Sequence, residues 1–148
     1  MNKQTILNIL FPRRCPVCGE IVKPAGSLIC PSCFRELSFV KSPTCKICGK
    51  ELENDRMELC EACTAHRHAF SYGVALLNYD EIARESMVKI KYKNKREYLD
   101  FYGAAMAARF EKTIQRMQVD AIVPIPIHRS RLRKRGFNQA EEIGRAHV

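Results

Sequence analysis

Eight cysteines lie in the first half of the chain, and their spacing is regular. They form four C-x2-C pairs that begin every fifteen residues, and no cysteine follows Cys63. A C-x2-C turn presents two thiolates to one metal ion, and four thiolates complete the tetrahedral shell that zinc prefers, at about 2.3 Å. We therefore predict two structural Zn²⁺ sites whose ligands are Cys15, Cys18, Cys30, Cys33, Cys45, Cys48, Cys60 and Cys63.

The pairs belong to a unit of thirty residues that occurs twice. Residues 15–19 (CPVCG) align with residues 45–49 (CKICG), and residues 30–33 (CPSC) align with residues 60–63 (CEAC). Each copy holds a complete set of four ligands, which favours sequential pairing over a cross-brace in which the pairs interleave. A unit of about 30 residues buries too little apolar surface to fold by itself, so zinc must supply much of its folding free energy.

Three alternatives to this assignment stay open. A disulfide framework and an iron–sulfur cluster are two of them, although cysteines in a reducing compartment favour metal ligands and iron–sulfur proteins usually space their ligands unevenly. The third is that His66 or His68, which follow Cys63 closely, replaces a cysteine. Because a four-cysteine set is already complete, we interpret both histidines as linker residues.

Composition narrows the class of protein. The chain has 148 residues, 46% of them hydrophobic and 28% charged, and its 25 Lys and Arg against 16 Asp and Glu give a net charge of +9. Eight thiolates and two Zn²⁺ would lower this charge to about +5. The apolar runs are too short for a membrane span, and residues 1–12 lack the features of a secretory signal. We expect a folded, basic, cytoplasmic protein.

Two runs of basic residues are candidate phosphate contacts. Lys89, Lys91, Lys93, Lys95 and Arg96 surround Tyr92, so this run could bind nucleic-acid phosphates while the tyrosine stacks on a base. The second run ends in a glycine that lets the backbone approach a phosphate. We predict that it binds phosphate or nucleic acid through Arg129, Arg131, Arg133, Lys134, Arg135, Gly136, Asn138 and Gln139.

For both runs a solvated helix face is the alternative. His128 has no evident partner in the sequence, so we interpret it as a loop residue, and we assign no catalytic residue.

The second half of the chain predicts α/β elements. Residues 69–79 are rich in aromatic and β-branched types and predict a strand, and Asp80 is placed to cap a helix that ends at a turn near Asn94. Residues 98–117 carry a wide apolar stripe, which predicts an amphipathic helix packed on a sheet. Residues 119–123 (VDAIV) predict a short strand buried in a parallel sheet and ended by the prolines that follow.

The predicted sheet is incomplete. After the strand we expect a basic loop and then a helix that begins near Asn138. Only twenty-five residues follow Val123. A parallel sheet needs about ten or more residues for each further crossover, so the chain is too short on this side to complete one.

A distinctive segment suggests a family. Residues 120–139 read DAIVPIPIHRSRLRKRGFNQ, and Phe11-Pro12 precede the doubled C-x2-C pattern. In these features the chain resembles the ComF (ComFC) competence proteins over almost its whole length. The resemblance implies a double zinc ribbon at residues 1–68, followed at residues 69–148 by the N-terminal part of an α/β type I phosphoribosyltransferase-like domain. It also implies single-stranded DNA and a competence helicase as partners during natural transformation.

Three functions are consistent with these features. The first is an accessory protein of DNA uptake that binds single-stranded DNA or another phosphate-bearing ligand. The second is phosphoribosyl transfer by the intact parent protein. The paired acidic residues and the Thr/Gly-rich loop that hold the sugar phosphate in that family are missing here, so we expect this chain to be inactive. The third is a zinc-ribbon adaptor that docks a partner protein.

The last seven residues stand apart from the rest of the chain. Residues 142–148 (EIGRAHV) match the translation of a common sequencing-library adapter, and we hypothesise that they are an artefact.

Overall fold

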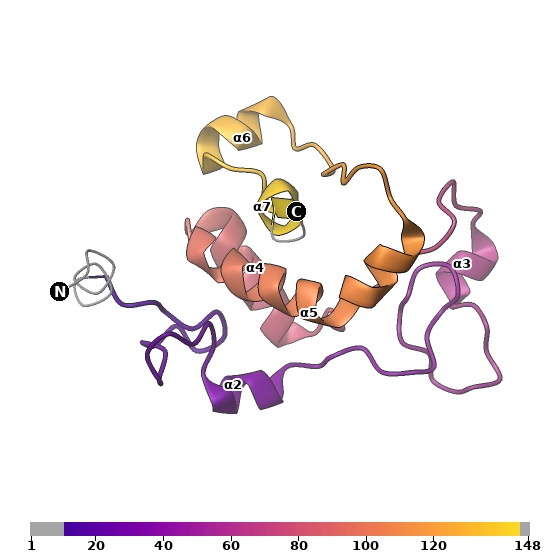
Figure 1. The fold of residues 1–148 in the computed structure, drawn as a ribbon, viewed down its shortest axis with the longest axis horizontal. Coiled ribbons are helices and arrows are strands. Elements are labelled where there is room, and N and C mark those ends of the chain that lie inside the picture. The colour runs from indigo at the N-terminus through magenta and orange to yellow at the C-terminus, as the bar shows by residue number, and fades with distance from the viewer. Residues whose placement is uncertain (1–10, 146–148) are drawn as a thin grey trace. The chain divides into compact units, whose positions relative to one another are not determined.

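The computed structural model describes residues 11–145 and divides into two compact units. The first unit combines residues 1–36 with residues 84–148, and the second consists of residues 37–83. Each unit therefore contains one copy of the thirty-residue repeat. The helices in chain order (Figure 1) are α2 (Pro31–Glu36), α3 (Glu61–Ala65), α4 (Glu81–Tyr92), the 3-10 helix η1 (Arg96–Tyr98), α5 (Leu99–Met117), α6 (Arg129–Arg135) and α7 (Gln139–Arg145).

The two copies of the repeat have the same backbone scaffold. An antiparallel bridge joins Arg14 to Ile21 in the first copy and Thr44 to Glu51 in the second. Within each bridge the first cysteine donates its N–H to a carbonyl five residues later, at 2.8 Å in both copies. Gly19 and Gly49 have φ of 80° and 73°, which a residue with a Cβ rarely adopts. The repeat seen in the sequence is thus a repeat in the fold.

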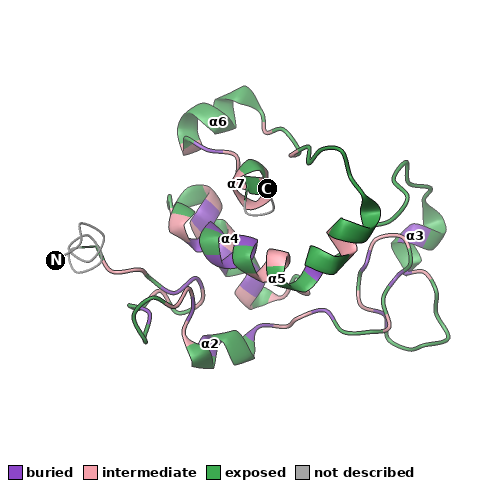
Figure 2. Ribbon diagram, in the orientation of Figure 1, coloured by how far each residue is buried: buried purple, intermediate pink, exposed green. Residues whose placement is uncertain are grey.

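The helix predictions are confirmed. Asp80 caps α4, because its Oδ1 accepts a hydrogen bond from the Ala83 N–H at 2.8 Å. Asn94 turns the chain after α4 with φ of 53°. The predicted amphipathic helix forms as η1 and α5, and α7 begins next to Asn138 as expected. The buried residues of this region lie mainly along α4 and α5 (Figure 2), with Ile90, Tyr98 and Phe101 at most 4% exposed.

The strand predictions are wrong. In the described part of the chain, β-structure consists of three isolated antiparallel bridges, and from residues 69–79 only Leu77 takes part, pairing with Phe39. Residues 119–128 form neither helix nor strand, and Val123 and Ile125 are 83% and 80% exposed. A buried strand needs neighbouring strands for its backbone hydrogen bonds, and the described residues supply none here. Accordingly α5 packs against α7 instead of a sheet.

The prediction of a basic loop after the strand is also wrong, because residues 129–135 form the helix α6. Its N-cap is His128, whose Nδ1 accepts a hydrogen bond from the Ser130 N–H at 3.3 Å. A capping side chain and five basic residues of good helix propensity favour a helix over a loop.

The domain boundary predicted between residues 68 and 69 stays a prediction. The two units are groups of residues that contact one another, and they do not test where the zinc-ribbon domain ends along the chain. Among the described residues, no helix combines the length and the apolar character needed to cross a bilayer. The interpretation of residues 1–12 concerns mostly residues outside the described part of the chain.

Candidate metal centres and nucleic-acid interface

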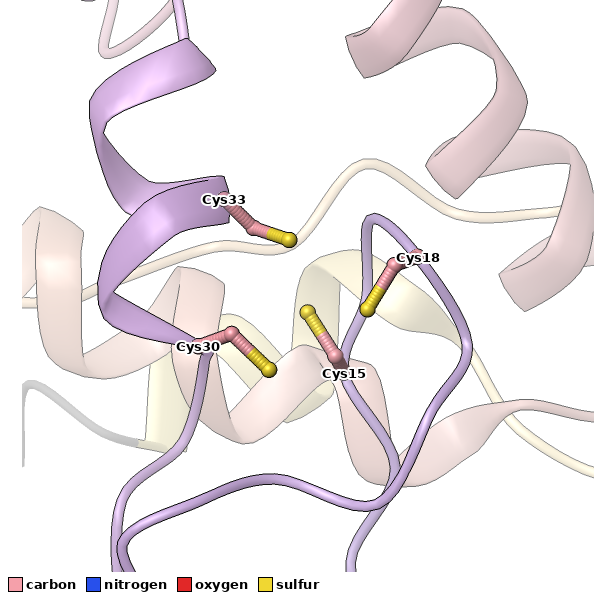
Figure 3. A group of neighbouring side chains, drawn as sticks. All are labelled: Cys15, Cys18, Cys30 and Cys33. Carbon is pink, nitrogen blue, oxygen red and sulfur yellow. The ribbon is translucent and has the colours of Figure 1, made fainter.

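The first group of cysteines has the geometry of a metal site. The Sγ atoms of Cys15, Cys18, Cys30 and Cys33 all lie within 4.8 Å of one another. Figure 3 shows the four sulfurs directed toward a common centre, two from the knuckle loop and two from the start of α2. Zinc–sulfur bonds of about 2.3 Å in a tetrahedron place sulfurs about 3.8 Å apart, so this donor set fits Zn²⁺.

The second group repeats this arrangement. Cys45, Cys48, Cys60 and Cys63 also have all four Sγ atoms within 4.8 Å of one another, and the Sγ atoms of Cys48 and Cys60 are 3.6 Å apart. The structure therefore groups the cysteines sequentially, as the repeat predicts, and not as a cross-brace. Each group uses four thiolates and leaves no position for a substrate, which is typical of structural zinc.

The first cysteine of each group has a lowered pKa, which favours its thiolate form. Burial raises the pKa of the Cys15 thiol, but backbone N–H groups of Cys30, Val17 and Cys18 hydrogen-bond its sulfur and lower the pKa to about 7. At Cys45 burial is likewise outweighed by backbone N–H groups, and the pKa falls to about 6. These donors stabilise the negative charge on a sulfur that is almost completely buried.

The opposite holds for the last cysteine of each group. Burial raises the pKa of the Cys33 thiol, and the neighbouring sulfurs of Cys18 and Cys15 raise it further, to about 12. Burial and the sulfurs around Cys63 raise its pKa to about 12 as well. Four thiolates this close together repel one another, so a divalent cation is needed to hold all of them ionised.

The structure adds a contact for one of the two candidate histidines. His68 contacts a ligand, because its Nε2 lies 3.4 Å from the Cys63 Sγ, and its ring stacks on Phe70 with centroids 4.9 Å apart. The contact is with the sulfur, and the four-cysteine set is complete without the imidazole. The linker interpretation of His68 therefore needs the addition that it is a hydrogen-bonding neighbour of the second site.

Residues of both basic runs line one pocket in the first unit. Its volume is about 420 Å³, and it lies between the end of α4 and the helix α6. Arg135 joins the two helices, because its Nε donates a hydrogen bond to the Lys91 carbonyl at 3.2 Å. Tyr92 is 69% exposed. The described residues that line the pocket are Lys91, Tyr92, Asn94, Arg131, Lys134 and Arg135.

The other residues predicted for this interface serve different purposes. Gly136 ends α6 with φ of 83°, and its N–H donates to the Leu132 carbonyl at 2.7 Å. The Asn138 side chain donates to the Ile125 carbonyl at 3.0 Å, and Gln139 accepts from Arg135. These partners are within the chain, which favours a structural explanation for the glycine and both amides. Arg129 and Arg133 are exposed on α6 outside the pocket lining.

The residues of the first basic run, which begins at Lys89, also make different kinds of contact. Lys91 and Tyr92 line the pocket, whereas the Lys89 ammonium donates to the Val17 carbonyl at 3.0 Å. Lys95 pairs with Glu97 at 3.7 Å, and the Arg96 guanidinium lies over the Phe137 ring, 5.7 Å from its centroid. Asn94 lines the pocket and was not predicted. Its position between two lysines at an expected turn was the available signal.

Comparison with known proteins supports the metal sites. A family model described as a double zinc ribbon domain matches residues 6–64, a range that contains both cysteine groups. No curated protein and no solved structure matches the chain. The chain thus carries a double zinc ribbon, and its two four-cysteine groups suit two structural zinc sites.

Proposed function

We propose that the basic pocket binds a phosphate-bearing ligand, with single-stranded DNA as the primary candidate, and that the protein is a cytoplasmic accessory factor of ComF type in DNA uptake. The observation that carries the proposal is the convergence of the two basic runs. Lys91 and Arg131 are forty residues apart in the sequence and line the same pocket.

Charge supports an anionic ligand. Four cations line the pocket, and no carboxylate is among the described residues that line it. The residues of the first unit include twenty Lys and Arg against nine Asp and Glu. Cations gathered without acidic partners repel one another, and a bound phosphate relieves that repulsion.

Shape and aromatic content favour a single strand over a duplex. A volume of about 420 Å³ matches a site for one small ligand, such as one nucleotide, and is far too small to enclose a double helix. The exposed Tyr92 ring at the pocket offers a face on which an unpaired base can stack.

The test is fluorescence anisotropy with a labelled oligothymidylate. The double variant Arg131→Ala/Lys134→Ala removes two pocket cations whose side chains are exposed, and we expect affinity to fall at least about tenfold, with a smaller salt slope. Lys112→Ala/Arg116→Ala is the matched control, since it removes the same charge from exposed positions of α5 outside the pocket. Equal losses in the two double variants would show that net charge alone attracts the oligonucleotide.

A protein-docking role for the second unit is the alternative that an observation favours. Phe70, Tyr72 and Tyr79 are 49%, 45% and 69% exposed, and this unit has five Lys and Arg against seven Asp and Glu. An apolar docking surface responds little to salt, whereas phosphate binding weakens steeply. A ligand whose affinity is lost in Phe70→Ser/Tyr72→Ser and is insensitive to salt would support the adaptor function.

A further inference from the structure

The first zinc ribbon is bound to the helices of its unit by specific contacts. The Lys89 ammonium on α4 donates to the carbonyl of Val17, which lies in the knuckle between two ligands. The Arg13 guanidinium donates to the Glu97 carbonyl at 3.0 Å and pairs with Asp100 at 2.7 Å. These contacts attach the first C-x2-C turn, and the residue two positions before it, to α4, η1 and α5.

The equivalent positions of the second ribbon lack these contacts. The counterpart of Val17 is Ile47, whose carbonyl accepts a hydrogen bond from the Gly73 N–H of its own unit at 2.5 Å. The counterpart of Arg13 is Pro43, which has no charged group. The repeat therefore provides a natural control: the same knuckle, with and without a link to a helix.

The helix that receives the first ribbon also builds the pocket. Lys89 and Lys91 are two positions apart on α4, so their side chains leave the helix about 200° apart. One contacts the knuckle and the other lines the pocket, where the Lys91 carbonyl also accepts from Arg135 of α6. The contacts are continuous from the first metal site through Lys89 to both walls of the pocket.

We propose that metal binding at the Cys15 site, acting through Lys89 and Arg13, positions α4 and thereby forms the basic pocket, and that the Cys45 site has no part in this. Lys89 is on this view a positioning residue and not a phosphate contact. The physical reason is that a zinc knuckle holds its fold only with metal bound, and a half-buried ammonium that loses its carbonyl acceptor destabilises the helix that carries it.

The first test compares Cys18→Ser with Cys48→Ser, which occupy the same position in the two copies. Each should remove one zinc ion. Hydrogen exchange of residues 84–92 should accelerate about tenfold or more in Cys18→Ser and change less than about twofold in Cys48→Ser. Oligothymidylate affinity should follow the same pattern. Equal acceleration of α4 exchange in the two variants would overturn the proposal.

A second set of variants keeps both metal sites intact. Lys89→Met should retain two zinc ions, yet accelerate exchange in residues 84–92 and weaken oligothymidylate binding by about tenfold. Lys89→Arg should restore both properties, because a guanidinium also donates to the Val17 carbonyl. Lys112→Met is the control for the lost charge. A Lys89→Met protein that behaves like Lys112→Met would refute the positioning role.

The binding readout depends on the proposed function, whereas the exchange readout does not. If the unaltered chain binds no oligothymidylate, the proposed function fails, and the exchange rates of α4 still decide whether the first metal site positions the helix.

Discussion

The two zinc ribbons share one backbone scaffold and differ in what surrounds them. Bridges, knuckle glycines and cysteine hydrogen bonds recur at an interval of thirty residues. The first ribbon belongs to a unit with twenty basic and nine acidic residues, and the second to a unit with five and seven. The repeated residues thus specify metal binding, and the residues that differ between the copies specify what each ribbon packs against.

The two copies of the repeat also differ in what contacts the position of Phe34. Phe34 meets the Phe101 ring of α5 edge to face, with centroids 6.4 Å apart. Its counterpart Thr64 instead donates its hydroxyl to the Cys60 carbonyl, four residues back in its own copy. One substitution between the copies exchanges an aromatic contact with a long helix for a local hydrogen bond.

Removal of zinc should produce the largest effect, because both ribbons depend on the metal and should unfold together. Purified protein should carry about two ions per chain, and Cys15→Ser or Cys45→Ser should each remove one. Because structural zinc contributes on the order of 10 kcal/mol to such modules, chelation should unfold both ribbons. Metal analysis and circular dichroism before and after chelation are the measurements. Loss of both ions from a single substitution would contradict independent sites.

A substitution in the core of the first unit should destabilise that unit and leave the second unit unaffected. Phe101 is 4% exposed and contacts both Phe34 and Tyr102. Truncation in Phe101→Ala should destabilise the first unit by about 3–5 kcal/mol. Hydrogen exchange should accelerate along α5 and leave residues 37–79 unchanged. Phe70→Ala, at a half-exposed ring of the second unit, is the control and should cost less than about 1 kcal/mol.

A pH series should show what the ribbons have in common. In the metal-free first site burial raises the pKa of Cys30 and Cys33, and in the second site it raises that of Cys48 and Cys63. These thiols are protonated at neutral pH and must lose their protons to bind zinc. Zinc binding at each site releases at least these two protons, so affinity should rise with pH by at least about a hundredfold per pH unit.

Competition with a zinc indicator between pH 6.5 and 7.5 measures this slope. The slope should be similar for Cys18→Ser and Cys48→Ser, which report on one remaining site each. A slope below one proton per ion would mean that the thiols are already ionised in the metal-free protein.

Local patterns in the sequence were sufficient for part of the fold. The ligand set, the repeat and the helices α4, α5 and α7 were all predicted. Each depends on residues close in the chain: a C-x2-C turn, the Asp80 cap, an apolar stripe at helical spacing. The predicted strand at residues 119–123 was wrong because a short apolar run forms a strand only if partner strands exist, and that is a property of the whole domain.

What the sequence by itself determined, then, is the chemistry of the cysteines and the helical segments, because spacing along the chain fixes both. Only the tertiary structure decided which basic residues line the same pocket. It placed Lys91 and Arg131 in the lining of one pocket, directed Lys89 to the first knuckle, and used Gly136 to end a helix. The sequence shows how many lysines a helix carries and how they are spaced. It does not show which other element of the fold each lysine contacts. Those contacts depend on the packing of segments far apart in the chain.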